Sequence, residues 1–195
     1  MFTTSQITRV CEEIQRRVDS GFTSSQTKMP FVVAIDGRAA SGKTTLAKRI
    51  AGCLDASLIH MDDFFLPPEL RTAERLATTG GNIHHERFAT EILPCIKETA
   101  SFSYNVFDCV AEKIVGYCPI YNKIRVVEGA YSCHPIFGQY ADLRIFCDIS
   151  PEEQMARIVA RTGQEKAQVF KEKWIPLEEK YLEQYQIKCN ADLVL

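Results

Sequence analysis

The sequence contains no long apolar run and no recognisable export signal. Its first residues lack the basic start and extended apolar core of a secretory signal, and the longest apolar run near the start is only Phe31 to Ile35. No stretch approaches the roughly 20 apolar residues that a membrane-spanning helix needs. We therefore expect a cytoplasmic protein with no membrane partner.

The chain also lacks an excess of either charge and any closely spaced pair of cysteines. Its 23 basic and 25 acidic residues give a formal net charge of -2. Because nucleic-acid binding needs a basic surface, we expect no nucleic-acid partner. The eight cysteines are scattered without a C-x-x-C pair, and we interpret them as reduced core residues. No heptad repeat stands out, so a homo-oligomer stays an open alternative to a monomer.

What the chain does contain is the composition of an ordinary globular protein. Hydrophobic residues make up 46% of it and charged residues 25%, which argues against disorder. A chain of 195 residues can bury a core of useful size and is short enough for one compact unit. We expect a single domain over residues 1–195.

Short apolar runs alternate with segments of helical spacing. Phe31 to Ile35 is apolar without alternation, which is typical of a strand covered on both faces of a parallel sheet. Strands that alternate with helices indicate an α/β fold. Similar runs predict further strands at 57–61, 124–127, 143–149 and 192–195. Spacing and capping residues predict helices at 5–19, 86–98, 151–161 and 164–185, with a hairpin or insertion at about 101–122.

Four residues of two predicted helices carry further expectations. Pro94 is expected to kink the helix at 86–98, and Pro176 is expected to break the helix at 164–185. Trp174 and Tyr181 lie seven residues apart on that last helix. We expect both aromatic side chains to pack in the core.

Directly after the first predicted strand comes a glycine-rich segment, Gly37-Arg-Ala-Ala-Ser-Gly42-Lys43-Thr44. It satisfies G-x-x-x-x-G-K-[ST] and lies between a strand and a helix, as a phosphate-binding loop (P-loop) does. Its main-chain amides and the start of the helix attract phosphate oxygens. Lys43 can reach the outer phosphates, and the Thr44 hydroxyl can bind Mg²⁺. The predicted nucleotide-binding residues are Gly37, Ala39, Ala40, Ser41, Gly42, Lys43, Thr44 and Thr45.

Acidic residues follow two more of the predicted strands. Asp62 and Asp63 come after the second strand, and Glu128 ends the third. Carboxyl ends of parallel strands meet at the ligand-binding edge of a sheet, so these carboxylates should lie beside the P-loop. Asp62 is the candidate base for an attacking hydroxyl and, with Thr44 and Glu128, a candidate magnesium ligand. The sequence does not decide between Asp62 and Asp63 as the base.

Two arginines lie four residues apart on the helix that begins after Ser150. Arg157 and Arg161 share one face of that helix, and Gly163 follows as a plausible hinge. Arginines that close over a nucleotide neutralise charge on the transferred phosphoryl group and exclude water. We predict a short helical lid at about 157–168, with Lys43, Arg157 and Arg161 as catalytic cations. A solvated helix face is the alternative for the two arginines.

Together these segments resemble the uridine kinase family, within the group that includes phosphoribulokinase, pantothenate kinase and nicotinamide riboside kinase. The resemblance lies in Gly37 to Thr45, Met61 to Phe65, Val126 to Tyr131 and Arg157 to Arg161. It implies a three-layer α/β/α P-loop fold with a five-stranded parallel sheet. It also implies ATP and Mg²⁺ as cofactors, Asp62 as the base and Glu128 as an accessory acid. The implied activity is phosphoryl transfer to a hydroxyl of a small metabolite.

The acceptor implied by the resemblance is a nucleoside such as uridine. Where the family has an aspartate for the ribose hydroxyls this sequence offers His84, and Phe107-Asp108 stands in place of a Tyr-Asp pair. Pantothenate, nicotinamide riboside or a sugar-like molecule is therefore an alternative acceptor. The candidate acceptor-binding residues are Asp63, His84, Arg87, Asp108 and His134.

Two interpretations other than a kinase deserve a test against the sequence. A GTPase switch would need a guanine-binding Asn-Lys-x-Asp, whereas Asn122-Lys123 is followed by Ile124-Arg125. The GTPase is therefore disfavoured. A nucleotide-binding regulatory protein without catalysis stays an alternative, because the acceptor residues differ from those of the family.

Overall fold

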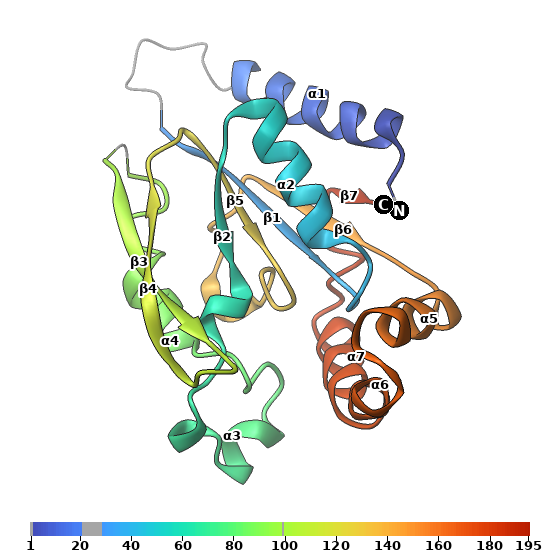
Figure 1. Ribbon diagram of the computed structural model, residues 1–195. Helices are drawn as coiled ribbons and strands as arrows, with labels where there is room; N and C mark the ends of the chain where they lie inside the picture. Colours follow the sequence, from blue (N-terminus) through green and yellow to red (C-terminus); the bar gives the residue numbers. More distant parts are fainter. Residues whose placement is uncertain (1, 21–28, 99) are drawn as a thin grey trace.

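The computed structural model describes residues 2–20, 29–98 and 100–195. Its centre is a parallel sheet in the order β2-β5-β1-β6-β7 (Figure 1). The strands of this sheet are β1 (Phe31–Gly37), β2 (Ser57–His60), β5 (Ile124–Glu128), β6 (Leu143–Cys147) and β7 (Leu193–Val194). Each forms where an apolar run predicts a strand. The predicted α/β fold with a five-stranded parallel sheet is confirmed.

Helices cover both faces of the sheet, as the burial of its central strands requires. Every residue of β5 is buried, which is typical of a strand covered on both sides. The cover on one face is α1 (Thr4–Ser20) and α2 (Lys43–Leu54), and on the other it includes α4 (His85–Glu91) and α7 (Ile175–Gln184). The three layers of the predicted α/β/α arrangement are therefore present.

The strand register brings three carboxyl ends to one edge of the sheet. Ile35 of β1 pairs with Glu128 of β5, and His60 of β2 pairs with the same Glu128. On the other side of β1, Gly37 pairs with Cys147 of β6. The segments that follow β1, β2 and β5 therefore leave the sheet side by side.

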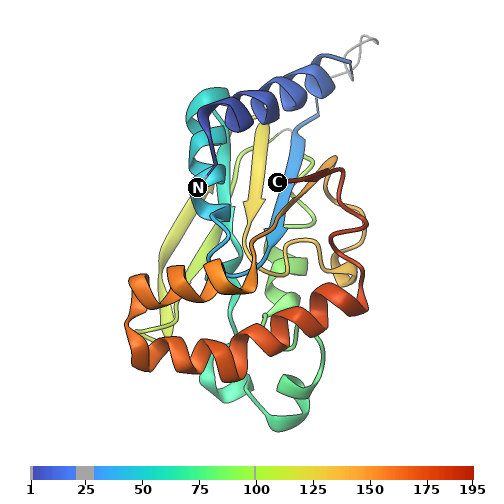
Figure 2. The same cartoon turned by 90° about the vertical axis from the view of Figure 1, so that its right-hand side faces the viewer.

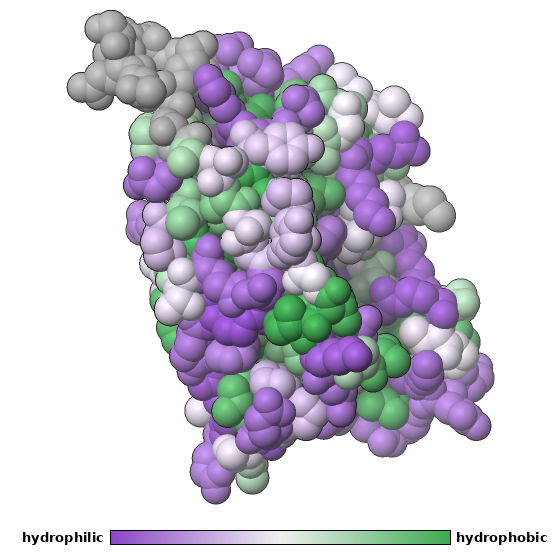
Figure 3. Space-filling view, turned by 60° about the vertical axis from the view of Figure 1, so that its left-hand side comes forward, coloured by the Kyte–Doolittle hydropathy of each residue, from purple (hydrophilic) through white to green (hydrophobic). Residues whose placement is uncertain are grey.

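A small antiparallel hairpin lies beside the main sheet. It consists of β3 (Phe102–Asp108) and β4 (Lys113–Ile120), with a register shift between Val106 and Phe107. The hairpin occupies the segment in which the sequence predicts a hairpin or insertion. On the face shown in Figure 3, polar side chains cover most of the surface and apolar ones gather in small patches.

The helix predicted over 86–98 is shorter in the structure. Helix α4 ends at Glu91, and the chain continues in turns through Lys97. Pro94 explains this end, because proline has no amide to donate and disfavours helical geometry in the residue before it. The carbonyl oxygens of Cys95 and Ile96 accept hydrogen bonds from the buried guanidinium of Arg125 instead.

The helices after β6 form a hairpin beyond the carboxyl end of the sheet (Figure 2). Helix α5 (Pro151–Thr162) is followed at Gly163 by α6 (Gln164–Val169), a π-helical turn η4 (Phe170–Trp174) and α7. The break predicted at Pro176 is present as this wider turn, which precedes a proline in the first turn of α7. Within the part of the chain that the structure describes, no helix is both long enough and apolar enough to cross a membrane.

Shorter elements connect the layers. The turn η1 (Met61–Phe64) follows β2, and η2 (Pro68–Leu70) and α3 (Ala73–Ala77) lead from there to α4. Another short turn, η3 (Pro135–Phe137), lies between β5 and β6.

Candidate active site

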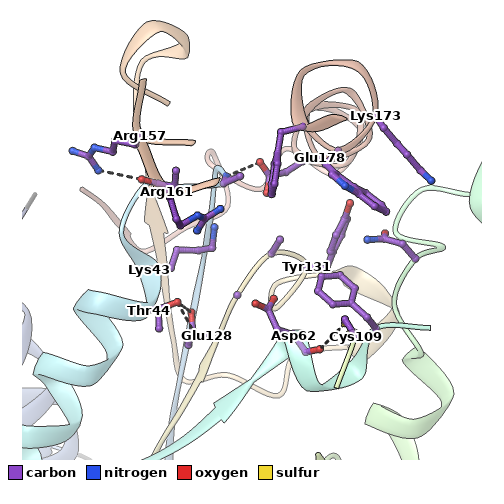
Figure 4. A pocket seen from close by; sticks show the side chains of 18 of the residues that line it. Lys43, Thr44, Asp62, Cys109, Glu128, Tyr131, Arg157, Arg161, Lys173 and Glu178 are labelled. Atoms are coloured by element: carbon purple, nitrogen blue, oxygen red, sulfur yellow. Dashed lines mark hydrogen bonds between the residues drawn. The ribbon is translucent and has the colours of Figure 1, made fainter. Parts of the chain in front are cut away.

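A cavity of about 750 Å³ opens at the carboxyl edge of the sheet (Figure 4). The P-loop, the start of α2, η1, the end of β5 and helices α5 and α7 contribute to its walls. Asp62, Glu128, Arg157 and Arg161 all line it together with Lys43. The structure thus brings together in one cavity the segments that the sequence selects for phosphate chemistry.

The P-loop is held close to its neighbouring strand at Gly37. The φ angle of Gly37 is 135°, and a Cβ atom there would lie 2.0 Å from the carbonyl oxygen of Cys147. Only glycine fits this approach. At the other end of the loop, Lys43 Nζ donates to the carbonyl oxygens of Gly37 and Arg38, at 2.6 and 2.9 Å.

The chemistry of this loop suits a bound polyphosphate. Helix α2 begins at Lys43, and the first amides of a helix have no carbonyl partner within the helix. Among the described residues, Ser41 Oγ is also buried without a hydrogen-bond partner. The loop therefore offers donors, an ammonium group and a helix N-terminus to an anion. The residues present fit the nucleotide that the sequence implies.

Oxygen ligands for a hard cation lie next to the loop. Thr44 Oγ1 is 3.1 Å from both carboxylate oxygens of Glu128, and Asp62 lines the same cavity. Among the residues that the structure describes, no group of three or more histidine, cysteine or acidic side chains is arranged to hold a metal. A hydroxyl and one or two carboxylates are nevertheless the protein ligands that Mg²⁺, which keeps several waters, commonly takes.

Glu128 has a partner that the sequence did not suggest. His60 Nδ1 lies 2.6 Å from Glu128 Oε1, and this contact raises the pKa of His60 above its ordinary value. The pair forms because β2 and β5 are neighbours and their last residues share one register position. His60 therefore helps Thr44 to fix the carboxylate of Glu128.

Asp62 has the surroundings of a base. It lies in η1 directly after β2, and its exposed side chain opens into the cavity. Partial desolvation by the cavity walls raises the pKa of Asp62, and the nearby charge of Glu128 raises it further. A carboxylate with a raised pKa is a stronger proton acceptor.

Asp63 points elsewhere. Its carboxylate accepts a hydrogen bond of 2.8 Å from the hydroxyl of Tyr104 in β3, and it does not line the cavity. Asp63 therefore connects η1 to the hairpin. Of the two aspartates, the geometry favours Asp62 for chemistry.

The two arginines of α5 lie over the P-loop. Arg157 donates to the carbonyl oxygen of Ala40 at 3.1 Å and pairs with Glu153. The Arg161 guanidinium lies 5.7 Å from the centre of the Phe170 ring. Both line the cavity, so their shared helix face is directed at the loop and not only at solvent.

Helix α7 supplies acids that sequence reasoning missed. Glu178 accepts a hydrogen bond from the Ala39 amide at 2.7 Å, and Glu179 pairs with Arg38 at 2.7 Å. Burial raises the pKa of Glu178 to about 7. Nothing in the sequence separates Glu178 from other helical glutamates, because its role comes from the packing of α7 against the P-loop.

Asp36 anchors the P-loop from below. Its carboxylate is fully buried and accepts hydrogen bonds from the Gly37 and Cys133 amides and from the Tyr181 hydroxyl, at 2.7, 2.9 and 2.6 Å. Burial raises the pKa of Asp36. A charged residue within β1, directly after its apolar run, was the available signal for this role.

Beyond Asp62 the cavity has mixed apolar and polar walls. These walls include Phe65, Leu66, Arg71, Leu76, Asn82, Cys109, Tyr131, Lys173 and Trp174. Trp174 therefore faces a cavity, which corrects the expectation that it packs in the core. Tyr181, in contrast, is fully buried as expected.

Tyr131 reaches this wall through an unusual backbone. It follows Gly129, whose φ angle is 130° and where a Cβ atom would lie 2.8 Å from Met61 Cβ. Tyr131 itself has a φ angle of 72°, which is uncommon for a residue with a side chain. Such strained positions often occur in binding sites.

The structure does not bring the five predicted acceptor residues into this cavity. Asp63 bonds to Tyr104, as described above. His84 caps the start of α4 by accepting from the amide of Arg87. Asp108 accepts from the amides of Val110 and Ala111 and so closes the turn between β3 and β4. For His84 and Asp108, local capping of the backbone explains the positions.

The other two predicted acceptor residues are also structural. Arg87 pairs with Glu91 at 2.8 Å and donates to the carbonyl oxygens of Asp63 and Asn105. It thereby joins α4 to η1 and β3. The ring of His134 stacks on Tyr181 with centroids 5.4 Å apart, and it borders a separate cavity.

Comparisons with known proteins identify the fold of the chain. No protein family matches the sequence, and no curated protein matches it either. Solved structures do match. A protein described as a possible uridine kinase from Bacillus stearothermophilus is 19% identical with a TM-score of 0.65, over 96% of this chain and 99% of that one.

Two further structures are similar over most of their length. A provisionally assigned fructose transport system kinase from Silicibacter sp. TM1040 is 18% identical with a TM-score of 0.75, over 100% of both chains. A D-glycerate 3-kinase from Cryptococcus neoformans is 13% identical with a TM-score of 0.63, over 91% of this chain and 88% of that one. The chain has the fold of the P-loop kinases.

Proposed function

We propose that this chain is a kinase that transfers the terminal phosphoryl group of ATP to a hydroxyl of a small metabolite. One observation carries the proposal: the carboxylate of Asp62 opens into the same cavity as Lys43 and the P-loop. A protein that only binds a nucleotide needs the loop but has no use for a second acid with a raised pKa beside it. Acids with perturbed pKa values in a cleft often serve chemistry.

The donor nucleotide would be held by the loop and the cations around it. The amides at the start of α2 and the Lys43 ammonium would bind the polyphosphate. Thr44, Asp62 and Glu128 would hold Mg²⁺. When bound, Mg²⁺ neutralises charge on the phosphate oxygens. Arg157 and Arg161 would add positive charge from α5 and keep water from replacing the acceptor.

Asp62 would act on the acceptor. In its ionised form it takes the proton of the acceptor hydroxyl as that oxygen attacks the terminal phosphorus. A new oxygen–phosphorus bond forms, the bond to the departing ADP breaks, and the proton stays on Asp62 until it reaches solvent. Glu128 is held by His60 and Thr44. The negative charge of Glu128 therefore stays near the cation site and would support Asp62 there.

The cavity wall beyond Asp62 bears on the choice of acceptor. Phe65, Tyr131 and Trp174 offer aromatic faces to a base, which fits the resemblance to uridine kinases. His84 and Asp108, which stand where the family would read the sugar, lie outside the cavity. Pantothenate, nicotinamide riboside and sugar-like molecules therefore belong in the same test as uridine.

The test is ADP release from ATP and Mg²⁺ in a coupled assay with a panel of hydroxylated acceptors. The kinase proposal expects release that depends on one acceptor, together with a phosphorylated product detected by mass spectrometry. Tight ATP binding without acceptor-dependent release across the panel would contradict the proposal and favour a regulatory nucleotide-binding protein. A GTP arm in the same assay establishes the preferred donor.

A further inference from the structure

The cations of the cavity fall into two groups. Lys43, Arg157 and Arg161 surround the P-loop, where the donor phosphates belong. Two more cations, Arg71 and Lys173, come from the segment after η2 and from η4. Figure 4 shows Lys173 at the side of the cavity away from Lys43. Positive charge is therefore present at both ends, and only one end is needed for ATP.

The acids of the cavity do not neutralise the second group. Glu128 is engaged by Thr44 and His60, and Glu178 lies on the Ala39 amide. Asp62 stands between the two ends, where its charge is needed for the acceptor hydroxyl. The acidic side chains that line the cavity thus leave Arg71 and Lys173 available to a ligand.

Lys173 is held in place by an aromatic ring. Its ammonium lies 4.7 Å from the centre of the Trp174 ring, and none of the carboxylates among the described residues forms a salt bridge with it. A cation on an aromatic face keeps its charge and its hydrogen-bond donors free on the opposite side. Lys173 can therefore bind an anion without first giving up an ionic partner.

Arg71 is oriented by the main chain. Its Nε donates to the carbonyl oxygen of Leu66 at 2.8 Å, and one Nη lies 3.3 Å from Glu112. Both side chains of that ion pair are exposed, so the pair is weak and exchangeable. The guanidinium is thus fixed at its base and remains able to take a carboxylate or phosphate.

The surroundings strengthen a charge interaction at this end. Phe65, Leu66 and Leu76 line the wall next to the cations, and apolar walls reduce the screening of charges. Asn82 and Tyr131 line the same cavity. They supply neutral polar groups that can recognise hydroxyls.

From this placement we infer that the acceptor is a hydroxylated anion. A carboxylate or phosphate group on it binds Arg71 and Lys173, and its reactive hydroxyl faces Asp62. The inference rests on the proposed kinase function for the direction of transfer. It restricts the expected acceptors to hydroxy acids and sugar phosphates and disfavours neutral nucleosides.

Binding can be measured without turnover because Trp174 is the only tryptophan of the chain. Its fluorescence reports directly on the cavity end that holds Lys173. We would titrate the protein, with Mg²⁺ and ADP present, with matched pairs of molecules that differ in charge. The pairs are pantothenate and panthenol, glycerate and glycerol, and ribose 5-phosphate and ribose, with uridine as a neutral reference.

We expect the titration of the Trp174 signal to give an anionic member a Kd at least about tenfold lower than that of its neutral partner. Comparison of the two carboxylate pairs with the phosphate pair shows which of the two anionic groups the site binds. Lys173→Gln and Arg71→Gln should each weaken that binding about tenfold or more, whereas Lys173→Arg should retain most of it. The matched control is Lys171→Gln, an exposed lysine of the same turn that does not line the cavity.

The outcomes separate this inference from the kinase proposal. Failure of every anionic probe to bind overturns the inference, as does equal binding of a neutral partner. Binding that Lys173→Gln and Arg71→Gln leave unchanged overturns it as well. Binding of an anion that is never phosphorylated would instead sink the kinase proposal while the anion site stands.

Discussion

The carboxylate of Glu178 accepts a hydrogen bond from the main-chain amide of Ala39 at 2.7 Å, so that an acid of α7 lies on the P-loop. Burial raises the pKa of Glu178 from an ordinary 4.5 to about 7, although the charge of Lys43 opposes the shift. An acid with this pKa changes its charge in the neutral range. The folding stability of the chain should therefore respond to pH through Glu178.

The sign of this response follows from the direction of the shift. Folded Glu178 holds its proton more tightly than unfolded Glu178, so its contribution to stability is complete below pH 4.5 and is lost as pH rises to about 7. The shift corresponds to about 3 kcal/mol. Glu178→Gln should therefore gain up to that amount over the wild type above neutral pH and little at acid pH.

Denaturant unfolding at a series of pH values measures this difference. Glu183→Gln is the matched control, because Glu183 lies exposed on the same helix. We expect its free energy of unfolding to follow the wild type at every pH. Parallel pH profiles for Glu178→Gln and the wild type would show that the buried carboxylate is not the titrating group.

Removal of the Lys43 amine should abolish tight binding of ATP. The ammonium lies at the P-loop carbonyls of Gly37 and Arg38, from which it can reach the outer phosphates. We expect Lys43→Ala to weaken ATP binding by at least about tenfold, the value of one charged hydrogen bond. Calorimetric titration measures the affinity, and Lys48→Ala on the exposed face of α2 is the control. Unchanged binding in Lys43→Ala would remove the P-loop assignment.

Asp62 and Asp63 offer a direct comparison of two adjacent carboxylates. Asp62→Asn should lower kcat by about 10²-fold or more and leave ATP affinity nearly intact, because the amide cannot take the hydroxyl proton. Asp63→Asn should change kcat far less, since Asp63 is bonded to Tyr104 and lies outside the cavity. Steady-state kinetics with the identified acceptor gives both values. A larger loss of kcat in Asp63→Asn than in Asp62→Asn would assign the base to Asp63.

The parts of the site that the sequence predicts are those set by short-range rules. A glycine-rich loop between a strand and a helix can hardly lie anywhere but at the edge of a parallel sheet, which places Lys43 and Thr44. Asp62 and Glu128 follow strands of the same sheet, so the topology brings them to that edge. For these residues, the local sequence pattern and the topology of the sheet predict the same position.

The remaining residues depend on packing between distant segments. Glu178 reaches Ala39 across more than a hundred residues of chain, and Lys173 and Arg71 line one cavity only because η4 and the segment after η2 both border it. None of Glu178, Lys173 and Arg71 lies in a local sequence pattern that would predict its place at the site. His84 and Asp108 lie outside the cavity for a local reason instead, because these polar residues cap the backbone of their own turns.

Arg125 should be essential for stability although it lies far from the cavity. Its side chain is 1% exposed and donates to the carbonyl oxygens of Asn122, Cys95, Ile96 and Ala100. Those of Cys95 and Ile96 belong to the turns that Pro94 imposes. Arg125→Met would remove all four hydrogen bonds, including the buried one to Ile96, at a cost of about 3 kcal/mol or more. Denaturant unfolding should show this loss, whereas Arg49→Met on the exposed face of α2 should stay within about 0.5 kcal/mol of the wild type; equal effects of the two variants would contradict the structural role of Arg125.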